Sequence, residues 1–137
     1  MRAVVDVNVL ISGVLSTKGS PAEILRASRD GQSDLVVSGL LLAELKRTLA
    51  YPKLRKRITP EKAAAFIDWV GDHGTVAEDP ASPPPVGSRD PDDDYLLALA
   101  IDRRAYLITG DQDLLALSSD LPILTPAQFT VKLHATR

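Results

Sequence analysis

The chain has 137 residues, 45% of them hydrophobic and 25% charged, and its formal net charge is −2. This composition is typical of one globular domain, which we expect to span residues 1–137, and it excludes a disordered or fibrous chain, while the absence of cysteine excludes disulfides and thiolate metal sites. No apolar run approaches the ~18 residues that a membrane span requires, so we expect a cytoplasmic protein without a membrane partner.

The first predicted element is an apolar run near the N-terminus, AVV at 3–5 and VNVLI at 7–11, with Asp6 between its two parts. Continuous apolar runs of this kind suit strands that are buried on both faces of a parallel sheet. An isolated buried carboxylate is very costly in free energy, so Asp6 must be paired, hydrated in a cleft or bound to a cation. Asp6 is therefore the first candidate functional residue.

Residues 20–49 predict a helix, a strand and a second helix. The first helix starts at Ser20-Pro21, because a side-chain oxygen can cap exposed amides and proline suits the first helical position. Glu23 stands at the capping-box spacing after Ser20. LVV at 35–37 is the strand. The second helix begins at Ser38 and has an apolar face formed by Leu41, Leu45 and Leu49.

Residues 59–100 predict two more helices with the same start signal, at Thr59-Pro60 and at Asp90-Pro91. TVA at 75–77 is a weaker strand candidate. The proline-rich segment 78–88 has no periodicity, and we expect a stiff surface loop there rather than an interdomain linker.

The C-terminal part predicts strands in AYLIT at 105–109 and ILT at 123–125, and a last helix from Thr125-Pro126. Strands and helices thus alternate along the whole chain. Alternation of this kind indicates an α/β fold, in which right-handed crossovers place helices on both sides of a mainly parallel sheet.

Acidic residues are placed where such a fold binds ligands, outside the carboxyl ends of its strands. Asp6 follows the first strand residues, Asp111 and Asp113 follow a strand, and the cluster at 90–94 opens a helix. Glu44 lies two turns into its helix and borders the apolar face. All of these acids can reach one end of the sheet.

Each acid also has a purely structural explanation. Asp90 can cap a helix, Asp92 and Asp94 can complement its dipole, Asp111 and Asp113 can form a turn, and Glu44 can be a solvated edge residue. However, dipole complementation is worth only ~0.3–1 kcal/mol per acid, and clustered like charges repel by comparable amounts. Capping alone does not require so many aspartates.

Acids that meet at one end of a sheet repel one another unless a multivalent cation lies among them. Oxygen ligands without cysteine or a well-placed histidine favour Mg²⁺ or Mn²⁺ over zinc. Magnesium keeps several waters and often completes its shell with phosphate oxygens, so the implied chemistry is on phosphate esters.

Four segments resemble the acidic sequence blocks of PIN-domain nucleases, in the same order along the chain. They are DVNVLISG at 6–13, SGLLLAEL at 38–45, DPDDDYLLALA at 90–100 and LITGDQDLL at 107–115. The resemblance extends to the toxins of bacterial and archaeal toxin–antitoxin pairs, relatives of the VapC toxins. It implies a three-layer α/β/α sandwich and divalent-metal-dependent hydrolysis of single-stranded or structured RNA. It further implies that the chain binds an antitoxin protein as its partner and forms a homodimer.

The resemblance implies that Asp6, Glu44, Asp111 and one aspartate of the 90–94 cluster form a catalytic quartet of metal ligands. Within the cluster we choose Asp93, because the residues at i+3, i+4 and i+7 from it are apolar and direct its face to the core. Asp94 remains the alternative. Further residues match small polar positions of the family and are expected to orient ligands or contact phosphate, with the last also a candidate metal ligand: Asn8, Ser12, Thr109 and Asp113.

One dense basic run follows Glu44 and is a candidate RNA-binding segment. Its cations are Lys46, Arg47, Lys53, Arg55, Lys56 and Arg57. Contacts from such residues to phosphates would make RNA binding fall with salt. The alternative is a solvated helix end, where cations also favour the helix dipole.

Other functions remain to be weighed against a nuclease. A phosphoryl-transfer enzyme on the haloacid-dehalogenase plan needs a second aspartate at the place of Asn8, and a receiver domain needs adjacent acids where Val5 and Val7 flank Asp6. Both are disfavoured. A catalytically inactive PIN-like module that binds proteins is the remaining alternative, and metal titration would distinguish it from a nuclease.

Overall fold

The computed structural model describes residues 1–84, 87 and 93–136, and within them it contains a five-stranded sheet. All strand pairs are parallel and the order is β3-β2-β1-β4-β5. The strands are β1 (Arg2–Val5), β2 (Asp34–Ser38), β3 (Thr75–Ala77), β4 (Tyr106–Ile108) and β5 (Ile123–Leu124). The predicted α/β class with a parallel sheet is confirmed.

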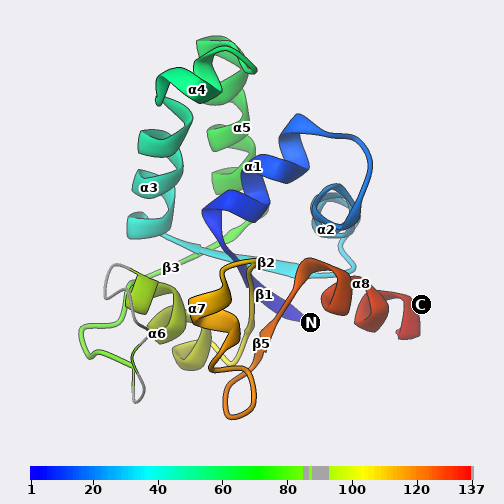
Figure 1. Cartoon of the computed structure of the whole chain (residues 1–137), viewed down its shortest axis with the longest axis vertical. Coiled ribbons are helices and arrows are strands. Elements are labelled where there is room, and N and C mark those ends of the chain that lie inside the picture. The colour runs from blue at the N-terminus through cyan, green and yellow to red at the C-terminus, as the bar shows by residue number, and fades with distance from the viewer. Residues whose placement is uncertain (85–86, 88–92, 137) are drawn as a thin grey trace.

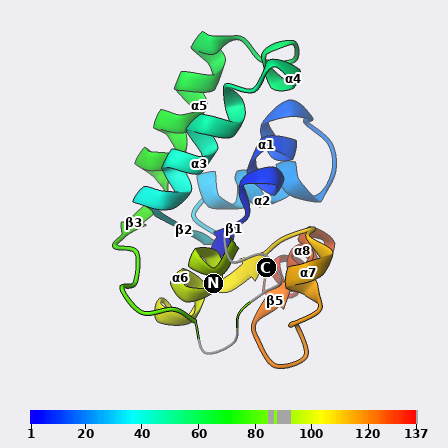
Figure 2. The ribbon, with the colours of Figure 1, turned by 60° about the vertical axis from the view of Figure 1, so that its left-hand side comes forward.

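Helices cover both sides of this sheet. Figure 1 shows α1, α3 and α5 on one side and α6 on the other, and the second view agrees (Figure 2). In both views α3, α4 and α5 extend away from the sheet. The helices are α1 (Val7–Leu15), α2 (Ser20–Arg29), α3 (Gly39–Leu49), α4 (Pro52–Arg55), α5 (Pro60–His73), α6 (Asp94–Asp102), α7 (Gln112–Leu115) and α8 (Pro126–Ala135).

The core is almost entirely aliphatic. The predicted apolar face of α3 is confirmed, because Leu41, Leu45 and Leu49 are all buried. Full burial of a leucine side chain contributes roughly 1.5–3 kcal/mol to folding, so this face anchors α3 to the sheet. Among the described helices, none has the length and apolar character needed to cross a membrane.

Three predicted helix caps are confirmed by hydrogen bonds to backbone amides. Ser38 accepts from Leu41, and Thr59 accepts from Lys62. Thr125 forms a full capping box with Gln128. The predicted start at Asp90-Pro91 lies outside the described residues, which place the beginning of α6 at Asp94.

The predicted cap of α2 is wrong by one residue. Gly19 is the N-cap, with a φ of 96° that side-chain-bearing residues rarely adopt, and Ser20 is the first helical residue. Glu23 makes no capping box with Ser20; it instead hydrogen-bonds His134 of α8. The glycine allows the chain to turn sharply enough for α2 to begin before proline.

The expectation of a strand at 7–11 is also wrong. β1 ends at Val5, and the backbone carbonyl of Asp6 accepts hydrogen bonds from Val9 and Leu10 at 2.9 and 3.0 Å, which starts α1. The first half of α1 is buried against the core, so its sequence is apolar on nearly every side and has lost the periodicity of a surface helix. Asp6 therefore stands at the junction of a strand and a helix.

Candidate active site

Asp6 and Thr109 lie together because their strands are neighbours. β1 pairs with β4 in a register that places Val5 beside Ile108, and each of these residues is followed by a polar side chain at the carboxyl end of the sheet. The Thr109 hydroxyl donates a 2.8 Å hydrogen bond to Oδ2 of Asp6. Asp6 is 7% exposed and Thr109 is fully buried, so this bond is shielded from water.

Asp111 is held next to this pair by two hydrogen bonds. Its backbone amide donates to the Thr109 hydroxyl at 3.0 Å, and its carboxylate accepts from the backbone amide of Asp113 at 2.8 Å. The second bond caps α7, as expected for an acid in a turn before a short helix. Capping uses one carboxylate oxygen of Asp111, and the other remains for a ligand.

Glu44 enters the site from α3 and is bound from the opposite layer. Ser38 starts α3 directly after β2, which is adjacent to β1 in the sheet. The hydroxyl of Tyr95, on α6, donates a 2.6 Å hydrogen bond to Oε2 of Glu44. Helices from the two sides of the sheet thus meet at this carboxylate.

Tyr95 was missed by the sequence analysis. It follows the acidic cluster directly and begins an apolar stretch, so a phenol in this place was a signal that a polar partner lies nearby. Its partner is 51 residues away in sequence, and nothing in the local pattern identifies it.

The charges at this end of the sheet act on one another. Burial raises the pKa of Asp6 above its ordinary value of 3.8, and the carboxylates of Glu44 and Asp111 raise it further. The Thr109 hydroxyl and the Asn8 backbone amide oppose this shift, although the amide is not placed for a capping hydrogen bond. Burial and Glu44 likewise raise the pKa of Tyr95, which keeps the phenol protonated as a donor.

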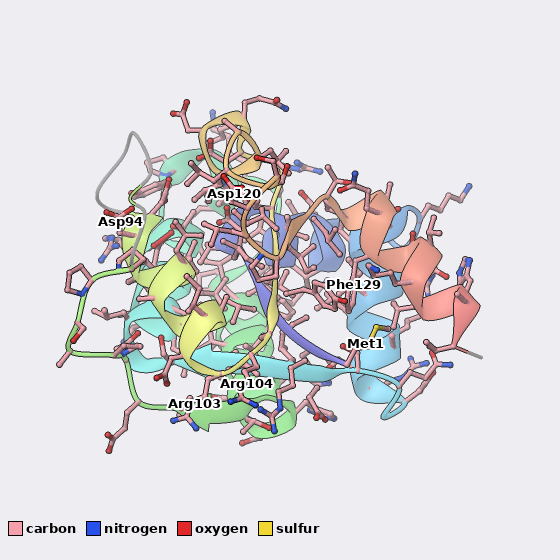
Figure 3. The ribbon with its side chains drawn as sticks, turned by 90° about the horizontal axis from the view of Figure 1, so that it is seen from below. Met1, Asp94, Arg103, Arg104, Asp120 and Phe129 are labelled. Carbon is pink, nitrogen blue, oxygen red and sulfur yellow. The ribbon has the colours of Figure 1, made fainter. Side chains whose placement is uncertain are left out.

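Asp93 and Asp94 point to different surroundings. The Asp93 carboxylate acts on Tyr95 together with Glu44 and Asp6, which places it near the other acids. Asp94 lies close to Gly87, where an added Cβ would stand 3.2 Å from its Oδ2. Figure 3 shows Asp94 at the start of α6, with Arg103 and Arg104 at the opposite end. Asp93 thus acts on the same phenol as Glu44 and Asp6, while the choice of Asp93 over Asp94 as the ligand stays a prediction. Asp90 and Asp92 lie outside the described residues.

The donors suit a hydrated divalent cation rather than a closed metal cage. Within residues 1–84, 87 and 93–136, no group of three or more histidines and carboxylates is close enough to hold an ion by itself. However, Mg²⁺ is usually bound through one or two carboxylates with waters and phosphate completing its shell. Asp6, Glu44 and Asp111 supply hard oxygen ligands whose mutual repulsion a cation would relieve, so the residues present fit magnesium or manganese and not zinc.

Two hollows flank the acids. One, of about 430 Å³, is lined by Asp6, Asp111 and Gly110 together with the exposed residues Asn8 and Ser12. The other, of about 320 Å³, is lined by Glu44 and Tyr95 together with Leu40, Ala43 and Arg47. The predicted phosphate-contacting residues of α1 therefore border the first hollow, whereas the buried Thr109 serves to orient Asp6 and Asp111.

The predicted basic segment is exposed but does not lie in one place. Arg47 borders the second hollow beside Glu44. Four other cations lie on α4 or just after it, at the far end of α3 from the sheet (Figure 1): Lys53, Arg55, Lys56 and Arg57. Lys46 is exposed on α3. Only Arg47 is thus brought to the acidic residues.

The sequence and the fold match known proteins over most of the chain. A family model described as PIN domain matches residues 2–113. An uncharacterized protein of Methanocaldococcus jannaschii, MJ1680, is 29% identical over 139 residues, which cover 94% of this chain and 89% of that protein. A chain in the crystal structure of VapBC2 from Rickettsia felis bound to a DNA fragment from their promoter has a TM-score of 0.62 at 14% identity, over 91% of this chain and 98% of that chain. The family model spans every acidic segment of the candidate site.

Proposed function

Because the chain belongs to the PIN domain family, we propose that it is a divalent-metal-dependent endoribonuclease that hydrolyses RNA phosphodiester bonds. The observation that carries this proposal is that Asp6, buried at the carboxyl end of the sheet, is acted on by the carboxylates of both Glu44 and Asp111. Residues 1–137 would act as one domain, since α8, beyond the region matched by the family model, is tied back to α2 through His134 and Glu23.

Asp6, Glu44, Asp93 and Asp111 would hold one or two Mg²⁺ or Mn²⁺ ions, with Asp94 or Asp113 as further candidate ligands. Such an ion would supply Lewis-acid chemistry, activating water and polarising the scissile phosphate, so no protein nucleophile would be needed. The chain's own residues supply position. Thr109 orients the Asp6 carboxylate and the Asp111 backbone, and Tyr95 orients Glu44.

Asn8 and Ser12 have a supporting role in this proposal. Both side chains are exposed on α1 at the hollow beside Asp6 and Asp111. Short polar side chains at such a position can donate hydrogen bonds to phosphate oxygens without blocking the approach of RNA. The Ser12 hydroxyl donates to the backbone carbonyl of Asn8 at 2.9 Å, so it would turn toward RNA only on binding.

The proposal extends to the biological role. The fold match to a chain of VapBC2 supports the toxin of a toxin–antitoxin pair, and we propose an antitoxin protein as partner, a homodimer as the assembly and the cytoplasm as the place of action. We expect a short reading frame that overlaps or adjoins the gene. Its product should copurify with this chain and suppress its cleavage of RNA. Absence of such a product would leave a nuclease without the toxin role.

The site is tested by Asp6→Asn, with Asp68→Asn as the matched control on the exposed surface of α5. Asp6→Asn should lower Mn²⁺-dependent cleavage of an RNA panel by at least about 100-fold, because a carboxylate ligand is lost. Asp68→Asn should cleave like the wild type. Full cleavage by Asp6→Asn would refute the assignment.

A catalytically inactive protein-binding module is the second candidate. One observation favours it, namely that the described residues form no group of three ready metal ligands. Titration with Mn²⁺, followed by electron paramagnetic resonance, separates the two functions. A nuclease should bind the ion through Asp6, whereas a module should show neither ion binding nor cleavage of any RNA in the panel.

A further inference from the structure

We propose that the hollow lined by Leu40, Ala43, Glu44, Arg47 and Tyr95, here called the α3 hollow, binds the nucleotide next to the scissile phosphate. In this proposal, which rests on the nuclease function above, Arg47 contacts a backbone phosphate and the apolar wall receives an unstacked base. The α3 hollow would thus hold one unstacked nucleotide of the RNA strand.

The first argument is the geometry of α3. Leu40, Ala43, Glu44 and Arg47 are spaced i, i+3, i+4 and i+7, so they share one face of the helix. Leu41 and the leucines that follow it occupy the buried face, so packing in the core does not require the four residues of the α3 hollow. One helical face therefore joins a candidate metal ligand to an apolar residue and a cation.

The second argument is the apolar wall. The side chain of Leu40 is 52% exposed, and exposure of a large apolar side chain to water contributes nothing to the stability of the fold. Its backbone is fixed by a 3.0 Å hydrogen bond from its amide to Asp79. Tyr95 uses its hydroxyl on Glu44, and its ring lines the hollow together with Leu40 and Ala43. Apolar and aromatic surfaces of this kind hold bases by stacking, largely without regard to sequence.

The third argument is the charge of Arg47. Its side chain is exposed, and it forms no ion pair with the carboxylates of the described segments, including Glu44 one turn away. A guanidinium beside a group of acids is well suited to bind phosphate, since it offers two parallel donors and offsets repulsion between the acids and RNA. Among the cations of the basic segment it borders the acids, whereas those on and after α4 do not.

The fourth argument is the arrangement of the two hollows. The hollow beside Asp6 and Asp111 is bordered by the exposed side chains of Asn8 and Ser12, and the α3 hollow contains Glu44, whose carboxylate acts on Asp6. A strand crossing the acids would enter both. About 320 Å³ lies at the lower end of the ~300–1,000 Å³ found for ligand pockets, which suits one nucleotide and not a duplex.

The test compares Arg47→Gln and Leu40→Ala with Arg29→Gln, an exposed arginine on α2 that is already paired with Asp30. Anisotropy of a labelled single-stranded RNA is measured without divalent ions, so binding is observed without cleavage. Arg47→Gln should weaken binding about 5- to 10-fold and lower the salt slope by about one, because one phosphate contact is lost. Steady-state cleavage should show the same rise in KM with kcat nearly unchanged, and Arg29→Gln should match the wild type in both assays.

The base is tested on the wild-type chain, which avoids any effect of substitution on folding. Oligonucleotides with one abasic position are scanned across the cleavage site. We expect the wild-type chain to bind more weakly when the abasic position lies next to the cleaved bond, and at no other position. In Leu40→Ala, the same abasic position should cause no further loss of binding.

Wild-type binding and cleavage by both variants would overturn the α3 hollow as a subsite while leaving the nuclease function intact. If Arg47→Gln or Leu40→Ala no longer binds a protein partner of the wild type but binds RNA as the wild type does, the subsite would be overturned as well. The α3 hollow would then belong to a protein interface. A wild-type chain that neither binds nor cleaves RNA would overturn both the subsite and the proposed function.

Discussion

The hydroxyl of Thr109 offers the sharpest test of how the acidic residues are held. It is fully buried, donates to Asp6 at 2.8 Å and accepts from the Asp111 amide at 3.0 Å. Thr109→Val keeps the shape of the side chain and removes both hydrogen bonds. We expect the variant to fold, since β-branched residues of equal size fit the same place after β4.

The cost can be worked from the two bonds. A hydrogen bond to an ionised group contributes about 1.5–3 kcal/mol, and leaving a partly buried amide without its acceptor costs about 1 kcal/mol more. Thr109→Val should therefore lose about 2.5–4 kcal/mol of unfolding free energy at neutral pH. Thr109→Ser keeps the hydroxyl and removes one methyl group, so its loss should be only about 1 kcal/mol.

The pH dependence of this loss follows from Asp6. Burial raises the pKa of Asp6, and the Thr109 hydroxyl opposes that shift because it favours the ionised form. The contribution of the bond is fully present above the pKa of Asp6 and declines as the pH falls through it. The stability difference between Thr109→Val and the wild type should thus narrow in acid.

Urea denaturation followed by circular dichroism measures this difference, in buffer without divalent ions, at neutral pH and near the ordinary aspartate pKa. Equal stability of Thr109→Val and the wild type at neutral pH would refute the reasoning. A difference that widens in acid would refute it too, because it would show that the hydroxyl favours the protonated carboxyl group.

Three further predictions concern stability. Asp6→Asn should raise the unfolding free energy at neutral pH in metal-free buffer. The pKa of Asp6 is raised in the folded protein, so the stability that the protonated carboxyl group provides below pH 3.8 is lost as the pH rises through the pKa of the folded state. Urea titrations that show no gain at neutral pH would contradict this. Gly13→Ala should lose about 1–3 kcal/mol of unfolding free energy, because its Cβ would lie 2.9 Å from the Pro21 carbonyl oxygen. Gly71→Ala, whose Cβ meets no atom within 4 Å, should gain about 0.5–1 kcal/mol of unfolding free energy in α5. Thermal melts in the opposite order would be evidence against that close approach of α1 to α2. Arg104→Gly should raise the unfolding free energy by up to about 1 kcal/mol, since φ is 52° there, and a loss by urea titration would disprove strain at this turn.

Local signals in the sequence predicted local structure well. Ser38, Thr59 and Thr125 cap their helices because the acceptor and the amide it binds are three residues apart, within one turn. The parallel sheet followed from the alternation of elements. Such features depend on short-range geometry, which a single sequence contains.

Features set by distant contacts were not predictable. The run at 7–11 is rich in β-branched residues, which favour a strand. It nevertheless forms the start of α1, because a helix buries these residues against the rest of the core. Tyr95 and Glu44 are joined by a hydrogen bond that no spacing rule indicates. The placement of Asp6 and Asp111 at the carboxyl end of the sheet followed from the α/β topology, whereas the α3 hollow beside Arg47 depends on how α3 and α6 pack.

The bond between Asp6 and Thr109 joins residues 103 positions apart, across the two strands at the centre of the sheet. Asp6 is therefore made 103 residues before the threonine that completes its surroundings. Long-range parallel pairing of this kind forms late and slowly. Under the nuclease function proposed above, the acidic site would therefore be completed only after Thr109 has been synthesised.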